Sequence, residues 1–202
     1  MLKRIRTVLW VACAIPVLAL LWVGIVTFTQ RTDDVSALQA SGIGGRFKLQ
    51  SSAGGELSSE NLKGKPFIVF FGFTHCPEIC PTTIADISSW LAALGPEGKE
   101  IKALFVSVDP ERDSVASLKD YLSSFPDRII GLTGTPEQIA QVAKEYRVYY
   151  AKHPLKDGDY TMDHSALIYL MDRDGKLAGT LTYDAKPEEA IAKLRRLLAA
   201  AA

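Results

Sequence analysis

Beyond about residue 45, the spacing of hydrophobic and polar positions predicts alternating strands and helices. Phe67 to Phe71 is an unbroken run of aromatic and β-branched residues, which is typical of a strand buried on both faces. Further strands are expected over residues 46–50, 101–108, 128–132, 165–171 and 177–183, and helices over residues 82–94, 114–124, 135–146 and from 187 onward. Residues 148–151 predict an extended segment that enters a polar loop over residues 153–159. The order ββαβαβαββα places the chain in the α/β class, as a mixed sheet flanked by helices.

The N-terminal part of the chain has a different pattern. Three basic residues within the first six precede an uncharged apolar stretch from about Val8 to Phe28. As a helix, this stretch would be roughly 30 Å long, which is enough to cross a bilayer core. A cleaved signal peptide is the alternative, although its apolar region typically has only about 7–15 residues. We therefore expect one membrane span, with Cys13 inside it as a small apolar residue.

These patterns divide the chain into three expected parts. Residues 1–29 are the cytoplasmic N-terminus and transmembrane anchor, residues 30–45 a polar, Gly-rich flexible linker, and residues 46–202 the folded domain. Basic residues before the span and Asp33 and Asp34 after it orient the N-terminus to the cytoplasm. Because no long Arg- and Ser-rich segment precedes the span, we expect a bacterial inner membrane with the domain in the periplasm, rather than a mitochondrial inner membrane.

Two cysteines follow the central predicted strand. Gly72 to His75 ends the apolar run and leads to Cys76 and Cys80, each of which is followed by a proline. Pro81 suits the first turn of a helix, where an N–H is not needed, and it disfavours helical angles at Cys80. We therefore expect Cys80 at the helix N-cap and Cys76 in the loop before it, where the helix dipole favours thiolates. A buried strand that leads to a cysteine loop and a helix is a thioredoxin-like arrangement, here with CxxxC spacing.

The cysteine pair supports several interpretations. A disulfide that only stabilises the fold is disfavoured, because so short a loop constrains the unfolded chain little. The pair can instead be a redox dithiol, a soft-metal site, or both, since thiolates select Cu(I), zinc or iron–sulfur. Two cysteines and one histidine are too few for a closed structural zinc site, which takes four ligands. They suit copper, which accepts low coordination as Cu(I).

Three histidines are candidates for the third ligand. His75 adjoins Cys76, and neighbouring residues of an extended loop tend to point apart. His153 falls in the polar loop and is expected to be solvated. His164 precedes the strand predicted from residue 165, where a side chain can face the loop above the sheet edge. Spacing favours His164 but leaves the choice open, because a lone histidine is often merely hydrogen-bonded.

An acidic segment is a further candidate for a functional role. Asp109 to Asp113 follows the second buried strand, on the side where such sheets place ligands. The segment can act on a metal or a partner, or it can simply form a turn and helix start in which Asp113 and Ser114 compete as caps.

The formal net charge is zero and no basic run follows the first six residues, so no nucleic-acid partner is expected.

Three stretches together resemble the Sco/SenC family: Gly72 to Pro81, Val106 to Asp113, and Asp163 to Ser165. The resemblance extends over essentially the whole chain after the linker and includes the anchor. It implies a thioredoxin-like fold with an N-terminal transmembrane helix, and it places the family's copper ligands on Cys76, Cys80 and His164. Glu78 stands where the family commonly has Asp, which keeps the charge.

The resemblance also implies a function. Family members are membrane-anchored proteins that help to deliver copper to the dinuclear copper centre of cytochrome c oxidase, and some act mainly as thiol–disulfide reductants for that centre's cysteines. The expected metal is copper, as Cu(I), Cu(II) or both. The expected partners are the copper-bearing subunit of the oxidase and other periplasmic copper chaperones or thioredoxin-like reductants.

Two other functions remain open, so whether the chain is an enzyme is undecided. One is a periplasmic thiol–disulfide oxidoreductase without an obligatory metal, in which Cys76 and Cys80 would be the catalytic dithiol. The other is a copper or redox sensor. His164 discriminates between copper binding and dithiol reduction, because a reductant does not need it. A peroxidase is disfavoured, since the Pro-x-x-x-Thr-x-x-Cys loop is absent.

Overall fold

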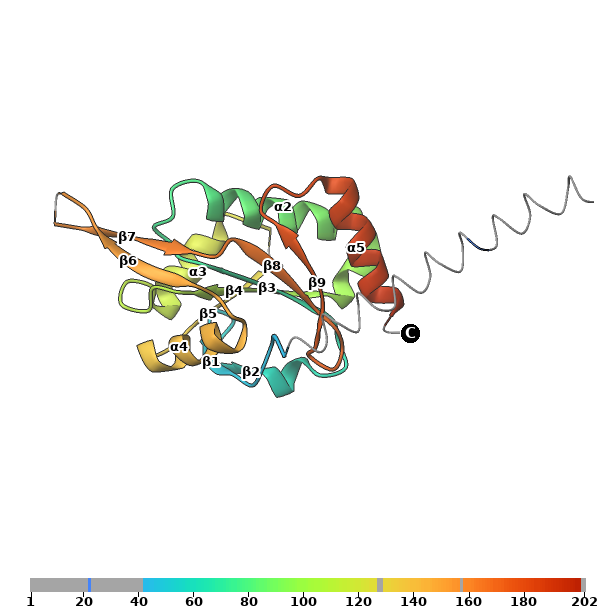
Figure 1. Cartoon of the computed structure of the whole chain (residues 1–202), viewed down its shortest axis with the longest axis horizontal. Coiled ribbons are helices and arrows are strands. Elements are labelled where there is room, and N and C mark those ends of the chain that lie inside the picture. Colours follow the sequence, from blue (N-terminus) through green and yellow to red (C-terminus); the bar gives the residue numbers. More distant parts are fainter. Residues whose placement is uncertain (1–21, 23–41, 127–128, 157, 201–202) are drawn as a thin grey trace, which may run out of the picture. The chain divides into compact units, whose positions relative to one another are not determined.

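A mixed seven-stranded sheet forms the centre of the folded domain (Figure 1). The computed structural model describes residue 22 and residues 42–126, 129–156 and 158–200, and those from 42 onward belong to one unit. In spatial order the strands are β2 (Glu56–Ser58), β1 (Lys48–Ser51), β5 (Ile129–Thr133), β4 (Lys102–Ser107), β3 (Phe67–Gly72), β8 (Leu167–Met171) and β9 (Leu177–Thr182). Strands β3, β4 and β5 run parallel, whereas β1 and β8 join them in the antiparallel sense. The prediction of a mixed sheet is therefore confirmed.

Helices cover both faces of this sheet. They are α2 (Ile79–Ala93), α3 (Val115–Ser123), α4 (Pro136–Glu145) and α5 (Pro187–Ala199), with short 3-10 turns η1 (Ser59–Leu62) and η2 (Gly95–Glu100). Tyr121 of α3 contacts the ring of Phe105 on one face, and Tyr146, the C-cap of α4, contacts Phe71 on the other. All six residues of β3 are buried, as the apolar run predicted for a strand covered on both faces.

Helix starts follow the predicted capping residues. Ser114 accepts a hydrogen bond from the Ser117 N–H and caps α3. Thr135 and Gln138 form a capping box at the start of α4, with Pro136 in its first turn. Such caps satisfy backbone donors that have no partner within the helix, which is why local sequence is enough to place them.

The prediction for residues 148–164 was confirmed only in part. The extended segment expected over residues 148–151 leads into β6 (Tyr150–Pro154), but β7 (Tyr160–His164) was not predicted, and the two strands pair antiparallel in a two-stranded sheet of their own. His164 therefore ends β7, and β8 begins only at Leu167. The outer part of this hairpin is exposed on both strands, so it lacks the apolar alternation by which a half-buried strand is recognised.

The expected membrane anchor lies outside the described residues. This applies to the apolar stretch from Val8 to Phe28, to Cys13 and to most of the expected linker, and only Trp22 within the stretch is described. In the part of the chain that the structure describes, no helix has the length and apolar character that a membrane crossing requires. The anchor and its orientation stay predictions.

The segment after β4 fastens the cysteine loop to the sheet. The side chain of Asp113 is fully buried, and its carboxylate accepts hydrogen bonds from the Thr74 N–H at 3.0 Å and the Thr74 hydroxyl at 2.6 Å. The Ser107 hydroxyl donates to the same carboxylate at 2.6 Å. Asp113 therefore does not compete with Ser114 as a helix cap. Its three donors join the ends of β3 and β4 just before Cys76.

We expect Asp113→Ala to destabilise the fold. The substitution would leave the Thr74 N–H, the Thr74 hydroxyl and the Ser107 hydroxyl without their acceptor, and each unsatisfied buried group costs about 1–3 kcal/mol. The free energy of unfolding should therefore fall by about 3 kcal/mol or more. Urea unfolding of a chain that begins at Gln30 can be followed by the fluorescence of Trp90, which is buried and is the single tryptophan of that chain.

Asp172→Ala is the matched control. The Asp172 carboxylate also accepts two hydrogen bonds, from the N–H groups of Asp174 and Lys176, but in an exposed turn where water replaces it. A similar loss of stability in both variants would show that burial of Asp113 is not the reason for its effect.

Candidate metal and dithiol site

Cys76, Cys80 and His164 converge beyond the carboxyl end of β3. One potential ligand atom from each lies within 4.8 Å of the others, and among the described residues no other group of His, Cys, Asp or Glu is arranged in this way. The Cys80 sulfur is 3.6 Å from His164 Nε2, although the two residues are 84 positions apart. Both cysteines are free thiols. The fold therefore brings the predicted ligands together.

The two cysteines are held differently by the start of α2. The helix begins at Ile79 with Glu78 as its N-cap, so Cys80 lies inside the first turn, and its predicted position at the N-cap was wrong. Pro81 is tolerated at the third helical position because the first four N–H groups of a helix have no intrahelical partner. Cys76 lies in the loop before the helix, as predicted, and its sulfur accepts a hydrogen bond from the Cys80 N–H at 3.3 Å.

Gly72 leaves the space that the Cys80 sulfur occupies. A Cβ atom at Gly72 would lie 2.8 Å from Cys80 Sγ and 2.6 Å from Cε2 of Phe105, closer than carbon can approach either atom. Cys80 is fully buried against this strand end, whereas Cys76 is half-buried. Sequence reasoning saw Gly72 only as the break in the apolar run, since the close approach depends on how α2 packs on β3 and β4.

The two thiols differ in acidity. A hydrogen bond from the Cys80 thiol lowers the pKa of Cys76 to about 4, against the opposing effect of burial. The backbone N–H groups of Cys80 and Glu78 lower it further. The hydrogen bond to Cys76, burial and the negative charge on Cys76 raise the pKa of Cys80 well above its ordinary value. At neutral pH the pair is therefore a thiolate at Cys76 stabilised by a thiol at Cys80.

His164 presents one particular nitrogen to the cysteines. Its Nδ1 lies 3.1 Å from the backbone carbonyl oxygen of Ser165, which can only accept, so Nδ1 carries the proton in the neutral ring. The lone pair of Nε2 is then free on the side of Cys80. The rings of Phe70 and Phe73 meet the imidazole edge-on at centroid distances of 6.2 and 5.8 Å and limit its rotation. A hydrogen bond from the second ring nitrogen is the usual support of a metal-binding histidine.

The other two histidines stay outside this cluster. His75 is exposed, and its Nδ1 is 3.1 Å from the Thr74 hydroxyl. His153 lies on the exposed hairpin and pairs with Asp163 at 2.8 Å. Of the three candidate histidines, the structure thus places His164 beside the two cysteines, whereas spacing alone had left the choice open.

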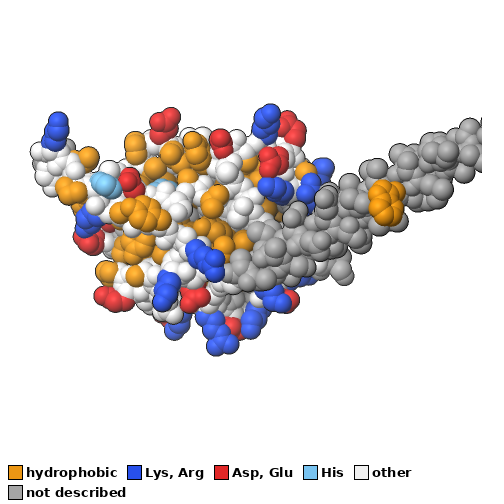
Figure 2. Space-filling model, viewed as in Figure 1, with side chains coloured by type: hydrophobic (Ala, Val, Ile, Leu, Met, Phe, Trp, Pro, Cys, Tyr) orange, Lys and Arg blue, Asp and Glu red, His pale blue; other side chains and the backbone are white. Residues whose placement is uncertain are grey.

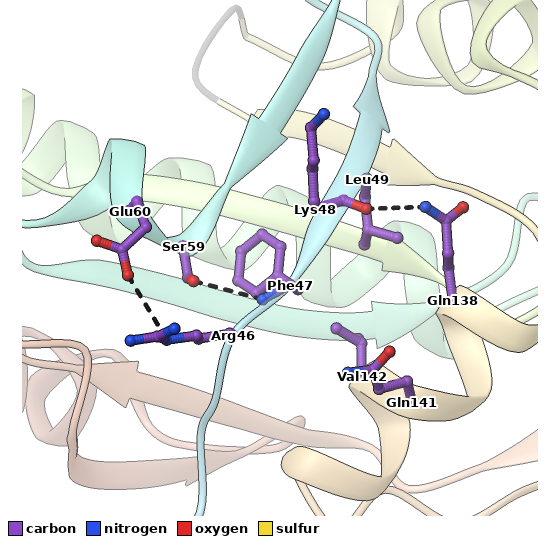
Figure 3. Close-up of a pocket in the computed structure, with 9 residues that line it drawn as sticks. All are labelled: Arg46, Phe47, Lys48, Leu49, Ser59, Glu60, Gln138, Gln141 and Val142. Carbon is purple, nitrogen blue, oxygen red and sulfur yellow. Dashed lines mark hydrogen bonds and ion pairs between the residues drawn. The ribbon is translucent and has the colours of Figure 1, made fainter.

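A hollow elsewhere in the domain lacks the residues for this chemistry. It has a volume of about 610 Å³ and is bounded by β1, η1 and α4 (Figure 3). Several of its polar groups bond to one another: Arg46 to Glu60, the Phe47 N–H to Ser59, and Gln138 to the Lys48 carbonyl. Its lining contains no cysteine or histidine. The soft donors therefore belong to the site at the end of β3.

The arrangement allows two kinds of chemistry. Two sulfurs and an imidazole nitrogen within 4.8 Å fit a soft metal ion, and copper suits this donor set better than zinc, which takes four protein ligands in closed sites. The same two sulfurs can form a disulfide when no ion is bound. Because a thiolate that coordinates a metal is not free to exchange with a disulfide, the two reactions exclude each other.

Comparison with known proteins connects this site to one family. The SCO1/SenC family model matches residues 35–199 of the chain. Protein SCO1, mitochondrial, of Saccharomyces cerevisiae is 44% identical over 149 residues, which cover 71% of this chain but only 50% of the yeast protein. The chain therefore corresponds to about half of that relative.

Solved structures agree with this match. The structure of Bradyrhizobium japonicum ScoI with copper bound superposes with a TM-score of 0.72 and 52% sequence identity, covering 77% of this chain and 99% of ScoI. BsSco, in which a disulfide switch was identified, is described as a member of the Sco family of cytochrome c oxidase assembly proteins. It superposes with a TM-score of 0.62 and 27% identity, covering 77% of this chain and 92% of BsSco. The match of sequence and fold over nearly all of the described domain shows that the chain belongs to the SCO1/SenC family.

Proposed function

We propose that the chain is a membrane-anchored, copper-binding assembly factor for cytochrome c oxidase. It delivers copper to the dinuclear copper centre of the oxidase, reduces the cysteines of that centre, or does both. The observation that carries the proposal is the convergence of Cys76, Cys80 and His164 within 4.8 Å. The copper in ScoI and the description of BsSco as a member of a family of oxidase assembly proteins support it.

Copper is the cargo of the site in this proposal. The Cys76 thiolate and the His164 Nε2 lone pair are available before the ion arrives, whereas Cys80 must release its proton as it binds. Copper then replaces that proton as the partner of both sulfurs, so loading should release protons. With three protein ligands, the copper ion can accept a further donor. An acceptor protein can therefore coordinate the ion before these three ligands dissociate.

Without copper, the dithiol acts as a reductant. The Cys76 thiolate attacks one sulfur of the partner's disulfide and forms a mixed disulfide, releasing the other partner sulfur as a thiolate. Cys80, after losing its proton, attacks the sulfur of Cys76. The partner leaves with both of its cysteines reduced, and Cys76 and Cys80 end as a disulfide after a transfer of two electrons.

The expected membrane topology suits both reactions. Residues 1–29 would anchor the protein in a bacterial inner membrane, and residues 30–45 would tether the domain, residues 46–202, in the periplasm. A tether keeps the site at a high local concentration near any partner in the same membrane. The proposed partner is the copper-bearing subunit of the oxidase, with other periplasmic copper chaperones or thioredoxin-like reductants upstream.

A periplasmic thiol–disulfide oxidoreductase, or a copper or redox sensor, without obligatory metal transfer is the second candidate. The low pKa and partial exposure of Cys76 favour it, because these are the properties of an attacking cysteine. His164 separates the two candidates, since Cu(II) binding depends on the imidazole and disulfide exchange does not.

Substitution of the three ligands tests copper binding. The unmodified protein should bind one copper ion per domain. Cys76→Ser and Cys80→Ser should abolish tight binding, because each removes a soft sulfur ligand. His164→Ala should weaken Cu(II) binding more than Cu(I) binding, because two thiolates satisfy Cu(I). Competition with chelators of known affinity, under reducing conditions for Cu(I), measures each constant.

His75→Ala and His153→Ala are the matched controls for the histidine. Both remove an imidazole from the described domain but outside the cluster, so copper affinity should not change. If either control weakens Cu(II) as much as His164→Ala does, the assignment of the third ligand is wrong.

The acidity of Cys76 predicts an unusual pH dependence of alkylation. Its lowered pKa, about 4, means that the thiolate is fully formed above about pH 5, so its reaction rate should be nearly constant between pH 5 and 8. An ordinary thiol, with a pKa of about 8.5, slows roughly tenfold for each pH unit below it. Mass spectrometry after brief iodoacetamide treatment should show the label on Cys76 and not on buried Cys80. The denatured protein is the control, and the same pH dependence before and after unfolding would contradict the prediction.

A gene deletion tests the role in the cell. Cytochrome c oxidase activity should fall most sharply when copper is scarce, and added copper should partly restore it. Cys76→Ser should behave like the deletion, whereas His164→Ala should fail only if metal transfer is essential. Oxidase activity measured in membranes of each strain distinguishes these outcomes. Normal activity in the deletion strain at low copper would rule out a required role in assembly and would favour a sensor.

A further inference from the structure

An ion pair between a buried carboxylate and a partly exposed arginine connects the segment after β4 to the hairpin that carries His164. Asp109 is 1% exposed, and its carboxylate accepts hydrogen bonds from Arg112 Nε at 2.5 Å and from the Tyr160 hydroxyl at 2.8 Å. Arg112 Nη1 donates to the Tyr160 carbonyl at 2.9 Å, and the guanidinium lies 3.7 Å from the centre of the Tyr160 ring. One residue of β7 is therefore held by its hydroxyl, its ring and its backbone.

The geometry of β7 links Tyr160 to His164. Alternate residues of a strand face the same side, so Tyr160, Met162 and His164 share one face. Met162 on this face is buried, whereas Asp163 on the opposite face is exposed. Four residues of strand span about 13 Å, and β7 pairs with β6 along its whole length. A change in the position of Tyr160 therefore changes where His164 points.

The hairpin has little other rigid support toward its outer end. In the described part of the chain, β6 and β7 pair only with each other, and the hairpin extends away from the large sheet (Figure 1). Its outer end stands clear of the body and carries exposed basic and hydrophobic side chains (Figure 2). Lys152 on β6 pairs with Glu111 at 2.7 Å, but both side chains are substantially exposed, and such pairs contribute only about 0–1 kcal/mol.

The same short segment thus contacts both halves of the site. Asp113 holds the loop before Cys76 through Thr74, and Asp109 and Arg112 hold the hairpin that ends at His164. Neither aspartate belongs to the cluster of potential metal ligands. Their contacts therefore assign the segment a supporting role that sequence analysis had left undecided.

We infer that Asp109, Arg112 and Tyr160 are positioning residues that hold His164 Nε2 toward Cys80 and thereby strengthen Cu(II) binding selectively over Cu(I) binding. The inference rests on the proposed function. Its physical reason is that Cu(I) is satisfied by two thiolates, whereas Cu(II) depends on the imidazole as well. Greater mobility of the hairpin should therefore weaken Cu(II) binding and leave Cu(I) binding nearly unchanged.

The test compares two substitutions in the cluster with one beside it. Arg112→Gln removes the contacts to Asp109, Asp159 and Tyr160, and Tyr160→Phe removes only the hydroxyl that bonds to Asp109. Each should weaken Cu(II) binding in the full-length protein, by about tenfold or more for Arg112→Gln, as outer-shell substitutions commonly do. Cu(I) affinity should change by less than about twofold. Glu111→Gln removes the exposed pair with Lys152 from the same segment and should leave both affinities unchanged.

A second measurement needs no metal. In the copper-free protein, the ring resonances of His164 in a histidine-labelled NMR spectrum should broaden or split in Arg112→Gln and Tyr160→Phe, because the ring samples more than one orientation. They should stay single in Glu111→Gln. If Arg112→Gln does not fold, Tyr160→Phe decides, since it keeps the ring and the ion pair.

A double-substitution cycle separates positioning from a general loss of structure. In a His164→Ala background, Arg112→Gln should cause no further loss of Cu(II) affinity, because there is no imidazole left to position. A further loss in that background, equal losses for Cu(I) and Cu(II), or unchanged His164 resonances would each overturn the inference. If the unmodified protein binds no copper, the proposed function fails instead, and the resonances of His164 still decide whether these residues position the ring.

Discussion

Two buried carboxylates after β4 are the interactions on which the site depends. An ionised carboxylate in a dry environment is tolerated only when donors or a cation surround it. Asp113 is surrounded by the Thr74 N–H and by the hydroxyls of Thr74 and Ser107, and Asp109 by Arg112 and the Tyr160 hydroxyl. These partners lie on different parts of the chain, so satisfying the two charges also fixes the cysteine loop and the hairpin relative to each other.

The free energy lost when such contacts break explains why the chain keeps the cysteine loop and the hairpin in this one arrangement. Removing one partner of a buried ion pair is strongly destabilising, by about 3–5 kcal/mol, because it leaves an uncompensated charge. The exposed pair of Lys152 and Glu111 on the same hairpin has no comparable penalty, since water can replace either partner. The contacts of Asp109 and Arg112 with Tyr160 therefore tie β7, the strand that ends at His164, to the segment after β4.

The two cysteines differ in burial, so one sulfur of the site is more accessible to a partner than the other. Cys80 is packed against Gly72 and Phe105 and is fully buried, whereas Cys76 is half-buried in the loop. A partner can reach the Cys76 sulfur without moving α2, but it cannot reach Cys80 in this way. The lowered pKa of Cys76 places the reactive thiolate on this accessible side. Geometry and acidity thus agree on which sulfur meets a partner first, whether the partner supplies copper or a disulfide.

Sequence alone determined the features that depend on neighbouring residues. The apolar run of β3, the caps at Ser114 and Thr135, and the two cysteines next to a helix start were all predictable, because strand burial and helix capping act over a few residues. The start of α2 was misplaced because Pro81 is compatible with any position in the first turn.

Only the tertiary structure shows which histidine lies beside the cysteines. Spacing favoured His164 without deciding and the family resemblance implied it, but the contact between Cys80 and His164 spans 84 positions and no local pattern reveals it. The pairing of β6 with β7 also escaped prediction beyond the start of β6, because the outer part of the hairpin is exposed and has no hydrophobic period. Tyr160 carries no local signal of its role, since its partners Asp109 and Arg112 are 51 and 48 positions away. Such long-range contacts depend on how the chain packs, and they place His164 beside the two sulfurs.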